Sequence, residues 1–214
     1  MKRTIWPVIL VIIAAMACMF SSCGINDEKT YLDQCKAAYS NLSTSSSAHY
    51  TQYLSIEIGE TVSQSSSECW YYNDTVVKKT VKDKVVIWIV EKENALFTRS
   101  IDDSFDSGWI SMGEEGNYVP SWVNLDWESL NLEFQSVEKK EDLLSIKCRR
   151  MSENENIPVS TVSFNFDDEQ LVSYTTTEAV EAGNGEMTVT YTFIDTNIDE
   201  IERYVSEVIT QITN

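Results

Sequence analysis

The chain of 214 residues has little of what most enzymes and nucleic-acid-binding proteins depend on. Its single histidine, His49, leaves few schemes for zinc binding or histidine-based catalysis. Glycine (7) and proline (3) are scarce, which excludes collagen-like and linker-dominated chains. Only 16 basic residues oppose 34 acidic ones, giving a formal net charge of −18. This charge argues against a nucleic-acid partner, because Lys and Arg are needed to neutralise phosphates.

Sequence motifs for catalysis are also absent. The chain has no glycine-rich phosphate loop, no H-E-x-x-H and no G-x-S-x-G. Asp102, Ser104 and Asp106 are spaced like part of a calcium loop, but Gly108 comes one position late and Gly113 stands where a Glu is required. Carboxylate pairs arise by chance among 34 acidic residues, so spacing cannot identify a glycosidase pair. We therefore predict no catalytic residue, no metal site and no cofactor.

What the chain does have is an export signal at its N-terminus. Lys2 and Arg3 precede an apolar run, and no charge occurs from Thr4 to Asn26. The segment Phe20-Ser21-Ser22-Cys23-Gly24 resembles the bacterial lipobox, although Phe20 replaces the usual aliphatic residue. Cys18 is a second candidate. An uncleaved membrane anchor is the alternative, because the uncharged stretch could nearly span a bilayer.

The predicted organisation follows from this leader. We expect a lipoprotein signal peptide over residues 1–22, a lipid anchor at Cys23 with a short tether over 23–26, and one extracytoplasmic domain over 27–214. The N-terminal lipid would be its contact with the membrane. Processing at Cys23 leaves three further cysteines, an odd number that allows at most one disulfide. Buried thiols and a single bridge both stay open; the three are Cys35, Cys69 and Cys148.

Hydrophobic periodicity predicts a helix at each end of this domain and strands between them. Apolar residues recur at helical spacing over residues 31–42 and 198–212, and Thr196 with Asp199 resembles a capping box for the second helix. About eleven short alternating segments lie between the helices, with a short amphipathic stretch at 121–130. The segment Val85–Val90 is apolar on both faces, which predicts a central strand covered on each side.

The fold class is therefore predicted as α+β, with a curled, mostly antiparallel sheet of about eleven strands. The order and length of these elements over residues 27–195 resemble the LolA-like superfamily, which includes periplasmic lipoprotein carriers. The resemblance rests on no shared motif, and the C-terminal helix is an addition to it. It implies a half-barrel that encloses an apolar cavity. A cystatin-like or NTF2-like cone is the competing fold, for which eleven strands are too many.

Aromatic residues are the remaining candidates for a functional surface. Trp122 and Trp127 lie in the segment before Leu130, where they could gate a hydrophobic pocket. Trp88 and Trp109 lie in predicted strands and complete the predicted ligand-binding set. Tryptophans in strands usually fill a core, and those before Leu130 could equally line a sugar-stacking groove or a partner surface.

Together these features predict a non-catalytic, lipid-anchored protein of the bacterial cell envelope that binds a hydrophobic ligand such as a lipid or acyl chain. An envelope protein-interaction module is the first alternative. Binding or hydrolysis of cell-wall carbohydrate is the second. Neither the protein partner nor the oligomeric state follows from the sequence.

Overall fold

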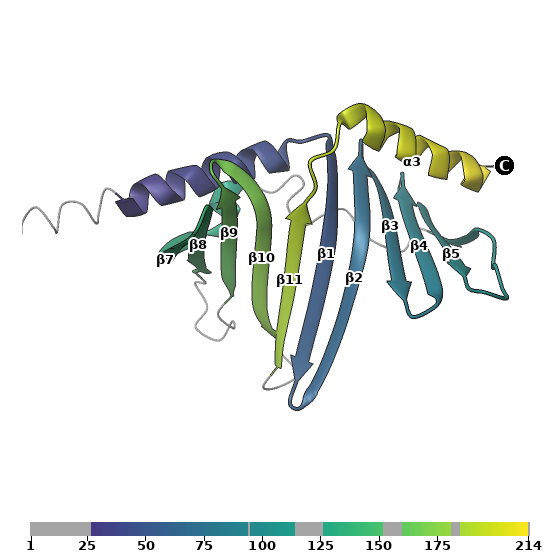
Figure 1. The fold of residues 1–214 in the computed structure, drawn as a ribbon, viewed down its shortest axis with the longest axis horizontal. Helices are drawn as coiled ribbons and strands as arrows, with labels where there is room; N and C mark the ends of the chain where they lie inside the picture. The colour runs from purple at the N-terminus through teal and green to yellow at the C-terminus, as the bar shows by residue number, and fades with distance from the viewer. Residues whose placement is uncertain (1–26, 94, 114–125, 152–159, 181–184, 214) are drawn as a thin grey trace, which may run out of the picture. The chain divides into compact units, whose positions relative to one another are not determined.

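A computed structural model describes residues 27–93, 95–113, 126–151, 160–180 and 185–213 of the chain. The chain divides into two compact units, residues 1–37 and 38–214. The described part of the first unit is helical, and this helix runs over residues 27–43. Within its described residues, the second unit contains eleven strands and two further helices (Figure 1). Its elements are β1 (Ser47–Ile58), β2 (Thr61–Tyr72), β3 (Thr75–Lys82), β4 (Val85–Lys92), β5 (Ala95–Ile101), β6 (Ile110–Gly113), α2 (Trp127–Leu130), β7 (Leu132–Lys140), β8 (Leu143–Arg150), β9 (Thr161–Asp167), β10 (Gln170–Val180), β11 (Gly185–Phe193) and α3 (Ile198–Thr213).

The eleven strands form one open sheet in the order β6-β5-β4-β3-β2-β1-β11-β10-β9-β8-β7. Every neighbouring pair is antiparallel. Two meanders, β1 to β6 and β7 to β11, are therefore joined through the pairing of β1 with β11 (Figure 1). This confirms the predicted α+β class, the antiparallel sheet of eleven strands and the helix at each end.

Short turns explain why consecutive strands pair. Asn73 and Asp74 connect β2 to β3 with positive φ angles of 43° and 62°, the backbone conformation of a two-residue hairpin turn that matches strand twist. Asp83, Glu141 and Asp168 take positive φ angles in the corresponding turns of other hairpins. The predicted turn at Gly183-Asn184-Gly185 falls almost entirely outside the described residues.

Side chains alternate between the two faces of a strand, so the register defines two faces of the sheet. One face, which we call the α3 face, carries His49, Trp70, Val77 and Val90 in adjacent strands. The apolar side of α3 packs on it through Ile201, Val205 and Val208, which are all buried. Burial of these aliphatic side chains holds the helix on β1, β2 and β3.

The opposite face, which we call the aromatic face, is apolar on the other half of the sheet. Ile146, Phe164, Tyr174 and Tyr191 stand in one row across β8, β9, β10 and β11. All four are buried, and Ile146 and Phe164 are fully so. On the α3 side of the same strands the residues are mostly Ser and Thr, and Thr175 and Thr190 share a hydrogen bond of 3.1 Å. The α3 face therefore carries one core, and the aromatic face carries another. On the aromatic face burial also extends to the other half of the sheet, at Tyr71, Val76 and Leu96.

Two local predictions are wrong. β4 is the third strand from one edge of the sheet, the centre is β1, and Ile87 of β4 is 37% exposed. Val90 is buried under α3, and on the other face Glu91 is also buried, between Val76 and Leu96, so the strand is covered on both faces only at this end. The helix α3 is capped by Asn197, whose Oδ1 accepts the Asp199 N–H at 2.9 Å, and not by Thr196.

Candidate ligand-binding site

A layer of aromatic rings covers the aromatic face where β9 and β10 lie side by side. The ring of Tyr39, from the end of the 27–43 helix, lies 6.0 Å from the rings of both Trp127 and Tyr174. Phe164 touches the same two rings, at 5.9 Å from Trp127 and 5.3 Å from Tyr174. These tilted and edge-on contacts are favourable arrangements of aromatic quadrupoles. Tyr39 and Phe164 are almost fully buried, whereas Trp127 is only half-buried.

The layer continues across the middle of the sheet. Tyr174 stacks on Tyr191 of β11 with ring centroids 6.2 Å apart, and Tyr191 meets Tyr50 of β1 at 5.9 Å. Phe166 and Cys148 stand beside these rings on β9 and β8, and both are fully buried. The site is therefore a continuous apolar layer that extends over five strands.

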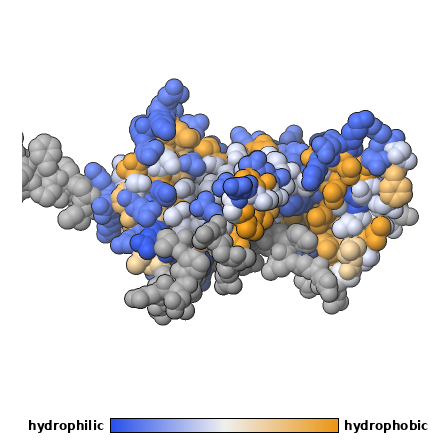
Figure 2. Space-filling view, turned by 90° about the horizontal axis from the view of Figure 1, so that it is seen from below, coloured by the Kyte–Doolittle hydropathy of each residue, from blue (hydrophilic) through white to orange (hydrophobic). Residues whose placement is uncertain are grey.

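Towards the β1–β2 turn this layer becomes accessible. Leu54 pairs with Val189, and Ile56 pairs with Met187, so these four side chains share the aromatic face. Val189 is buried, whereas Leu54, Ile56 and Met187 are half-buried, and Ile58 is 45% exposed. We call Leu54, Ile56, Met187 and Val189 the open strip. Figure 2, seen from the side of the β1–β2 turn, shows hydrophobic side chains reaching the surface among hydrophilic ones.

Few polar groups accompany these apolar residues. The Tyr39 hydroxyl is buried and has no hydrogen-bond partner in the described part of the chain. Burial raises the pKa of Tyr39 to about 12, and the positive charge of Arg150 opposes the rise. Burial also raises the pKa of Tyr174, with further contributions from Tyr39 and Tyr191, again opposed by Arg150. Arg150 ends β8 on the same face of the sheet, two residues after the buried Cys148.

The predicted tryptophans do not share one site. Trp127 belongs to the aromatic layer. Trp88 and Trp109 lie on the α3 face, where the Lys79 ammonium lies 5.4 Å from the Trp88 ring and the Arg99 guanidinium 5.9 Å from that of Trp109. Trp122 and Cys23 lie outside the described residues. The sheet thus separates Trp127 from Trp88 and Trp109.

Sequence reasoning missed the surroundings of His49, which is not isolated. Its Nδ1 lies 2.7 Å from Oγ1 of Thr196, and its Nε2 lies 3.1 Å from Oε1 of Glu68. The imidazole stacks on Trp70 at 5.0 Å, and Trp70 stacks on Tyr204 of α3 at 4.2 Å. The backbone N–H of Ile194 donates to the His49 carbonyl at 2.8 Å. These contacts tie the start of α3 to the sheet, and no spacing rule connects residues so far apart in sequence.

Two hollows lie elsewhere on the second unit. One of about 240 Å³ is lined by His49, Thr196 and Asp195 together with apolar residues from β11 and α3. The other, of about 530 Å³, lies at the β7–β8 and β9–β10 turns and is lined mainly by charged residues, among them Lys139, Asp142 and Asp168. No residue of the open strip lines either hollow. The lining of the larger hollow is mainly charged and does not suit an apolar ligand.

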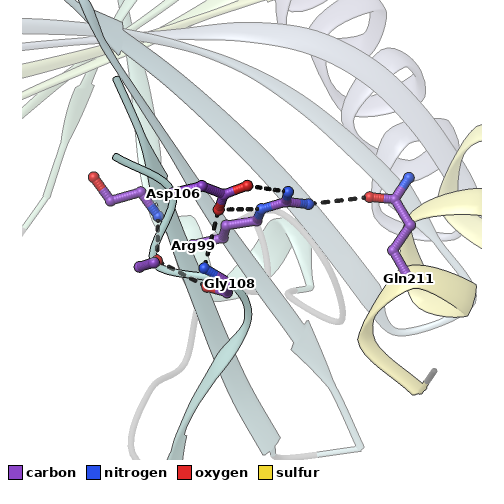
Figure 3. A network of polar contacts seen from close by, with 6 residues as sticks. Arg99, Asp106, Gly108 and Gln211 are labelled. Carbon is purple, nitrogen blue, oxygen red and sulfur yellow. Dashed lines mark hydrogen bonds and ion pairs between the residues drawn. The ribbon is translucent and has the colours of Figure 1, made fainter. Parts of the chain in front are cut away.

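The segment with the calcium-like spacing is a tightly bonded loop. Asp102 Oδ1 accepts the backbone N–H groups of Ser104 and Phe105 at 2.7 and 2.8 Å. Arg99 donates from Nε to Asp106 Oδ1 at 2.9 Å, and Gly108 donates its backbone N–H to the same oxygen (Figure 3). Arg99 also reaches Gln211 of α3 at 3.5 Å (Figure 3). The carboxylates of Asp102 and Asp106 thus accept hydrogen bonds that hold the loop in place.

Within residues 27–213, apart from the gaps given above, none of the helices is long and apolar enough to cross a bilayer.

Comparison with known proteins gives structural similarity only. The chain is similar to the crystal structure of a DUF1329 family protein from Desulfovibrio piger, with 10% identity, 77% of this chain and 91% of that chain covered, and a TM-score of 0.32. It is also similar to a putative outer membrane lipoprotein-sorting protein domain from Vibrio parahaemolyticus, with 8% identity, 81% and 97% coverage, and a TM-score of 0.33. No family profile and no curated protein matches the chain. At this level of identity and superposition, neither structure assigns a ligand or a function.

Proposed function

We propose that this protein is a lipid-anchored protein of the bacterial cell envelope that binds a hydrophobic ligand, such as a lipid or acyl chain, on the aromatic face of its sheet. The ligand would lie along the open strip and against the edge of the aromatic layer. The protein would act by binding, without a catalytic step.

The observation that carries the proposal is the transition from buried to accessible apolar residues on one face. The rings of Tyr174 and Tyr191 are buried, whereas Met187 of β11 and Leu54 and Ile56 of β1, nearer the β1–β2 turn, are half-buried. Each methylene that a ligand removes from water there contributes about 0.8 kcal/mol. Trp127 is half-buried at the rim of the layer, where a flat ring can move to admit a chain.

The leader sequence supports the location. Lys2 and Arg3 followed by an uncharged stretch direct export, and Cys23 after Ser21 and Ser22 provides the residue for acylation. Two acyl chains on one cysteine would hold the protein at a membrane, because one chain alone binds only marginally. Intact mass of the protein from the cell envelope tests this step. A diacylated Cys23 at the N-terminus is the expected species, and an unacylated or uncleaved product would contradict it.

Ligand binding is tested with the protein purified from the envelope in dodecyl maltoside. Organic extraction followed by mass spectrometry should release a lipid in stoichiometric amount. Methyl 9,10-dibromostearate, which quenches tryptophan fluorescence at short range, should then quench the protein in a saturable manner. Absence of both a co-purified lipid and saturable quenching would reject the proposal and leave the protein-interaction and carbohydrate alternatives.

Tryptophan variants locate the ligand on one face of the sheet. Trp127→Phe should lose most of the saturable quenching, because its ring contacts Tyr39 and Phe164 at the site. Trp88→Phe is the matched control, because Trp88 lies on the α3 face. Loss of quenching in the Trp88 variant alone would place the ligand under α3 and contradict the assignment to the aromatic face.

A further inference from the structure

The proposed ligand site contains a buried polar group, the Tyr39 hydroxyl, that forms no hydrogen bond with a described residue. The Tyr39 ring is 1% exposed, and its hydroxyl has no hydrogen-bond partner in the described structure. Buried hydroxyls are nearly always satisfied, because water is lost without replacement when they are not. Tyr39 lies against Trp127 and Tyr174, so the unused hydroxyl belongs to the aromatic layer itself.

Arg150 is placed at the edge of this layer by the register of the sheet. It ends β8 on the aromatic face, two residues after the buried Cys148, and lies opposite Leu132 of β7. The hydrogen bond from the Met151 N–H to the Asn131 carbonyl, at 2.8 Å, fixes this end of β8 beside α2, which carries Trp127. Its side chain is exposed and forms no ion pair with a carboxylate of any described residue. In a chain of net charge −18, an arginine that forms no ion pair with a described residue is well suited to bind an anion.

Among the described strand residues, Glu178 is an acidic group that faces the same region. Glu178 of β10 lies on the aromatic face, pairs with Met187 of the open strip, and lies close enough to Tyr174 to contribute to the rise of its pKa. It is half-buried and is not within ion-pairing distance of Arg150. An anion bound at Arg150 is therefore repelled by Glu178. Removing the charge of Glu178 should strengthen binding of the anion, and this direction can be tested.

We propose that the ligand is an anionic amphiphile, whose head group binds the Arg150 guanidinium and the Tyr39 hydroxyl and whose aliphatic chain lies on the open strip. This inference rests on the proposed function and specifies its ligand class. Arginine pairs with carboxylate or phosphate oxygens through two parallel hydrogen bonds, and the tyrosine adds one neutral donor. The aliphatic chain would extend over Met187, Val189, Leu54 and Ile56.

The test compares an acid with its uncharged ester. Tryptophan quenching by 9,10-dibromostearate and by its methyl ester is measured on the full protein in dodecyl maltoside, where partition into micelles is common to all variants. The unmodified protein should bind the acid at least about tenfold more tightly than the ester, the size expected for a charge-assisted pair. In Arg150→Gln this ratio should fall to near one, with binding of the ester retained.

Three further variants sharpen the assignment. Arg149→Gln is the matched control, because Arg149 pairs with Thr161 on the opposite face and should leave the ratio unchanged. Tyr39→Phe should lower the ratio by about two- to fivefold, as one neutral hydrogen bond is lost. Glu178→Gln should raise it, because repulsion of the head group is removed.

The outcomes separate the two proposals. If neither acid nor ester quenches, the proposed function itself fails. If both bind the unmodified protein equally, or if Arg149→Gln and Arg150→Gln have the same effect, the apolar site stands and the anionic head group is wrong. Lysophosphatidic acid should displace dibromostearate, whereas inorganic phosphate should not. Displacement by inorganic phosphate alone would overturn the role of the aliphatic chain.

Discussion

At the scale of single residues, His49 and Tyr39 show how differently the fold treats two polar side chains. Both ring nitrogens of His49 have partners, in Thr196 and Glu68, and its ring rests on Trp70. The Tyr39 hydroxyl, by contrast, is buried and has no hydrogen-bond partner among the described residues. A histidine whose two ring nitrogens both have hydrogen-bond partners is a structural contact between elements. A buried hydroxyl without a hydrogen bond needs another explanation.

Tyr39→Phe provides a residue-level prediction for the protein without ligand. Removing an unsatisfied buried hydroxyl should raise the free energy of unfolding by about 1 kcal/mol, because its desolvation is no longer opposed. Urea denaturation followed by circular dichroism measures this difference, after ligand has been extracted. A lower unfolding free energy in the variant would show that the hydroxyl has a stabilising partner after all.

At the scale of elements, α3 is held by its apolar side and by its first turn. The sequence correctly predicts the buried stripe of Ile201, Val205 and Val208. It misplaces the cap, because a hydroxyl at 196 and an amide at 197 both suit that role locally. The choice is made by tertiary structure, since His49 takes the Thr196 hydroxyl and leaves Asn197 to bond the Asp199 N–H.

Asn197→Ala should therefore lower the free energy of unfolding by about 1 kcal/mol, the usual cost of losing an N-cap. Ser206→Ala, on the exposed side of the same helix, is the control and should change it by a few tenths of a kcal/mol at most. Urea denaturation of the three proteins at one pH makes the comparison. An Asn197 variant as stable as the unmodified protein would point back to the Thr196 capping box.

The β5–β6 loop provides a prediction with a pH dependence. The hydrogen bond from Arg99 and that from the Gly108 N–H lower the pKa of Asp106 to about 2, from an ordinary value of 3.8. A lowered carboxyl pKa contributes stability that is fully present above about pH 4 and is lost as the pH falls towards 2. Asp106→Asn removes this contribution at all pH values.

The urea midpoint of the Asp106→Asn variant should therefore lie below that of the unmodified protein near neutral pH, and the gap should narrow as the pH approaches about 2. Because Asp106 is exposed, we expect a small difference that also shrinks in high salt. A gap that stays constant down to that pH would mean that the carboxylate charge has no part in holding the loop to Arg99.

At the scale of the whole molecule, the buried thiols of Cys69 and Cys148 report on the integrity of the core on the aromatic face. Cys35, Cys69 and Cys148 are thiols rather than disulfide partners, which resolves the choice that the sequence left open. Burial raises the pKa of Cys69 to about 11, and Cys148 is fully buried. A thiol that is both protonated and inaccessible reacts slowly with alkylating reagents.

Iodoacetamide near neutral pH should leave Cys69 and Cys148 unmodified in the folded protein and modify both in concentrated urea without reductant. Peptide mass mapping of the two residues measures the labelling. Fast labelling of either thiol under native conditions would show that its core opens readily. Failure to label in urea until a reductant is added would reveal a disulfide.

The sequence by itself determined the elements: the terminal helices, the number of strands, and hairpins such as the one at Asn73-Asp74. These depend on periodicity and turn chemistry, which act over a few residues. Only the tertiary structure decided what the elements bring together. The central position of β1 needs its pairing with β11, about 140 residues away. The separation of Trp127 from Trp88 depends on which face each core occupies. The contact of Tyr39 with Tyr174 depends on the packing of segments that are far apart in the sequence. Such contacts are set by packing and register across the sheet, and these leave no local pattern in the chain.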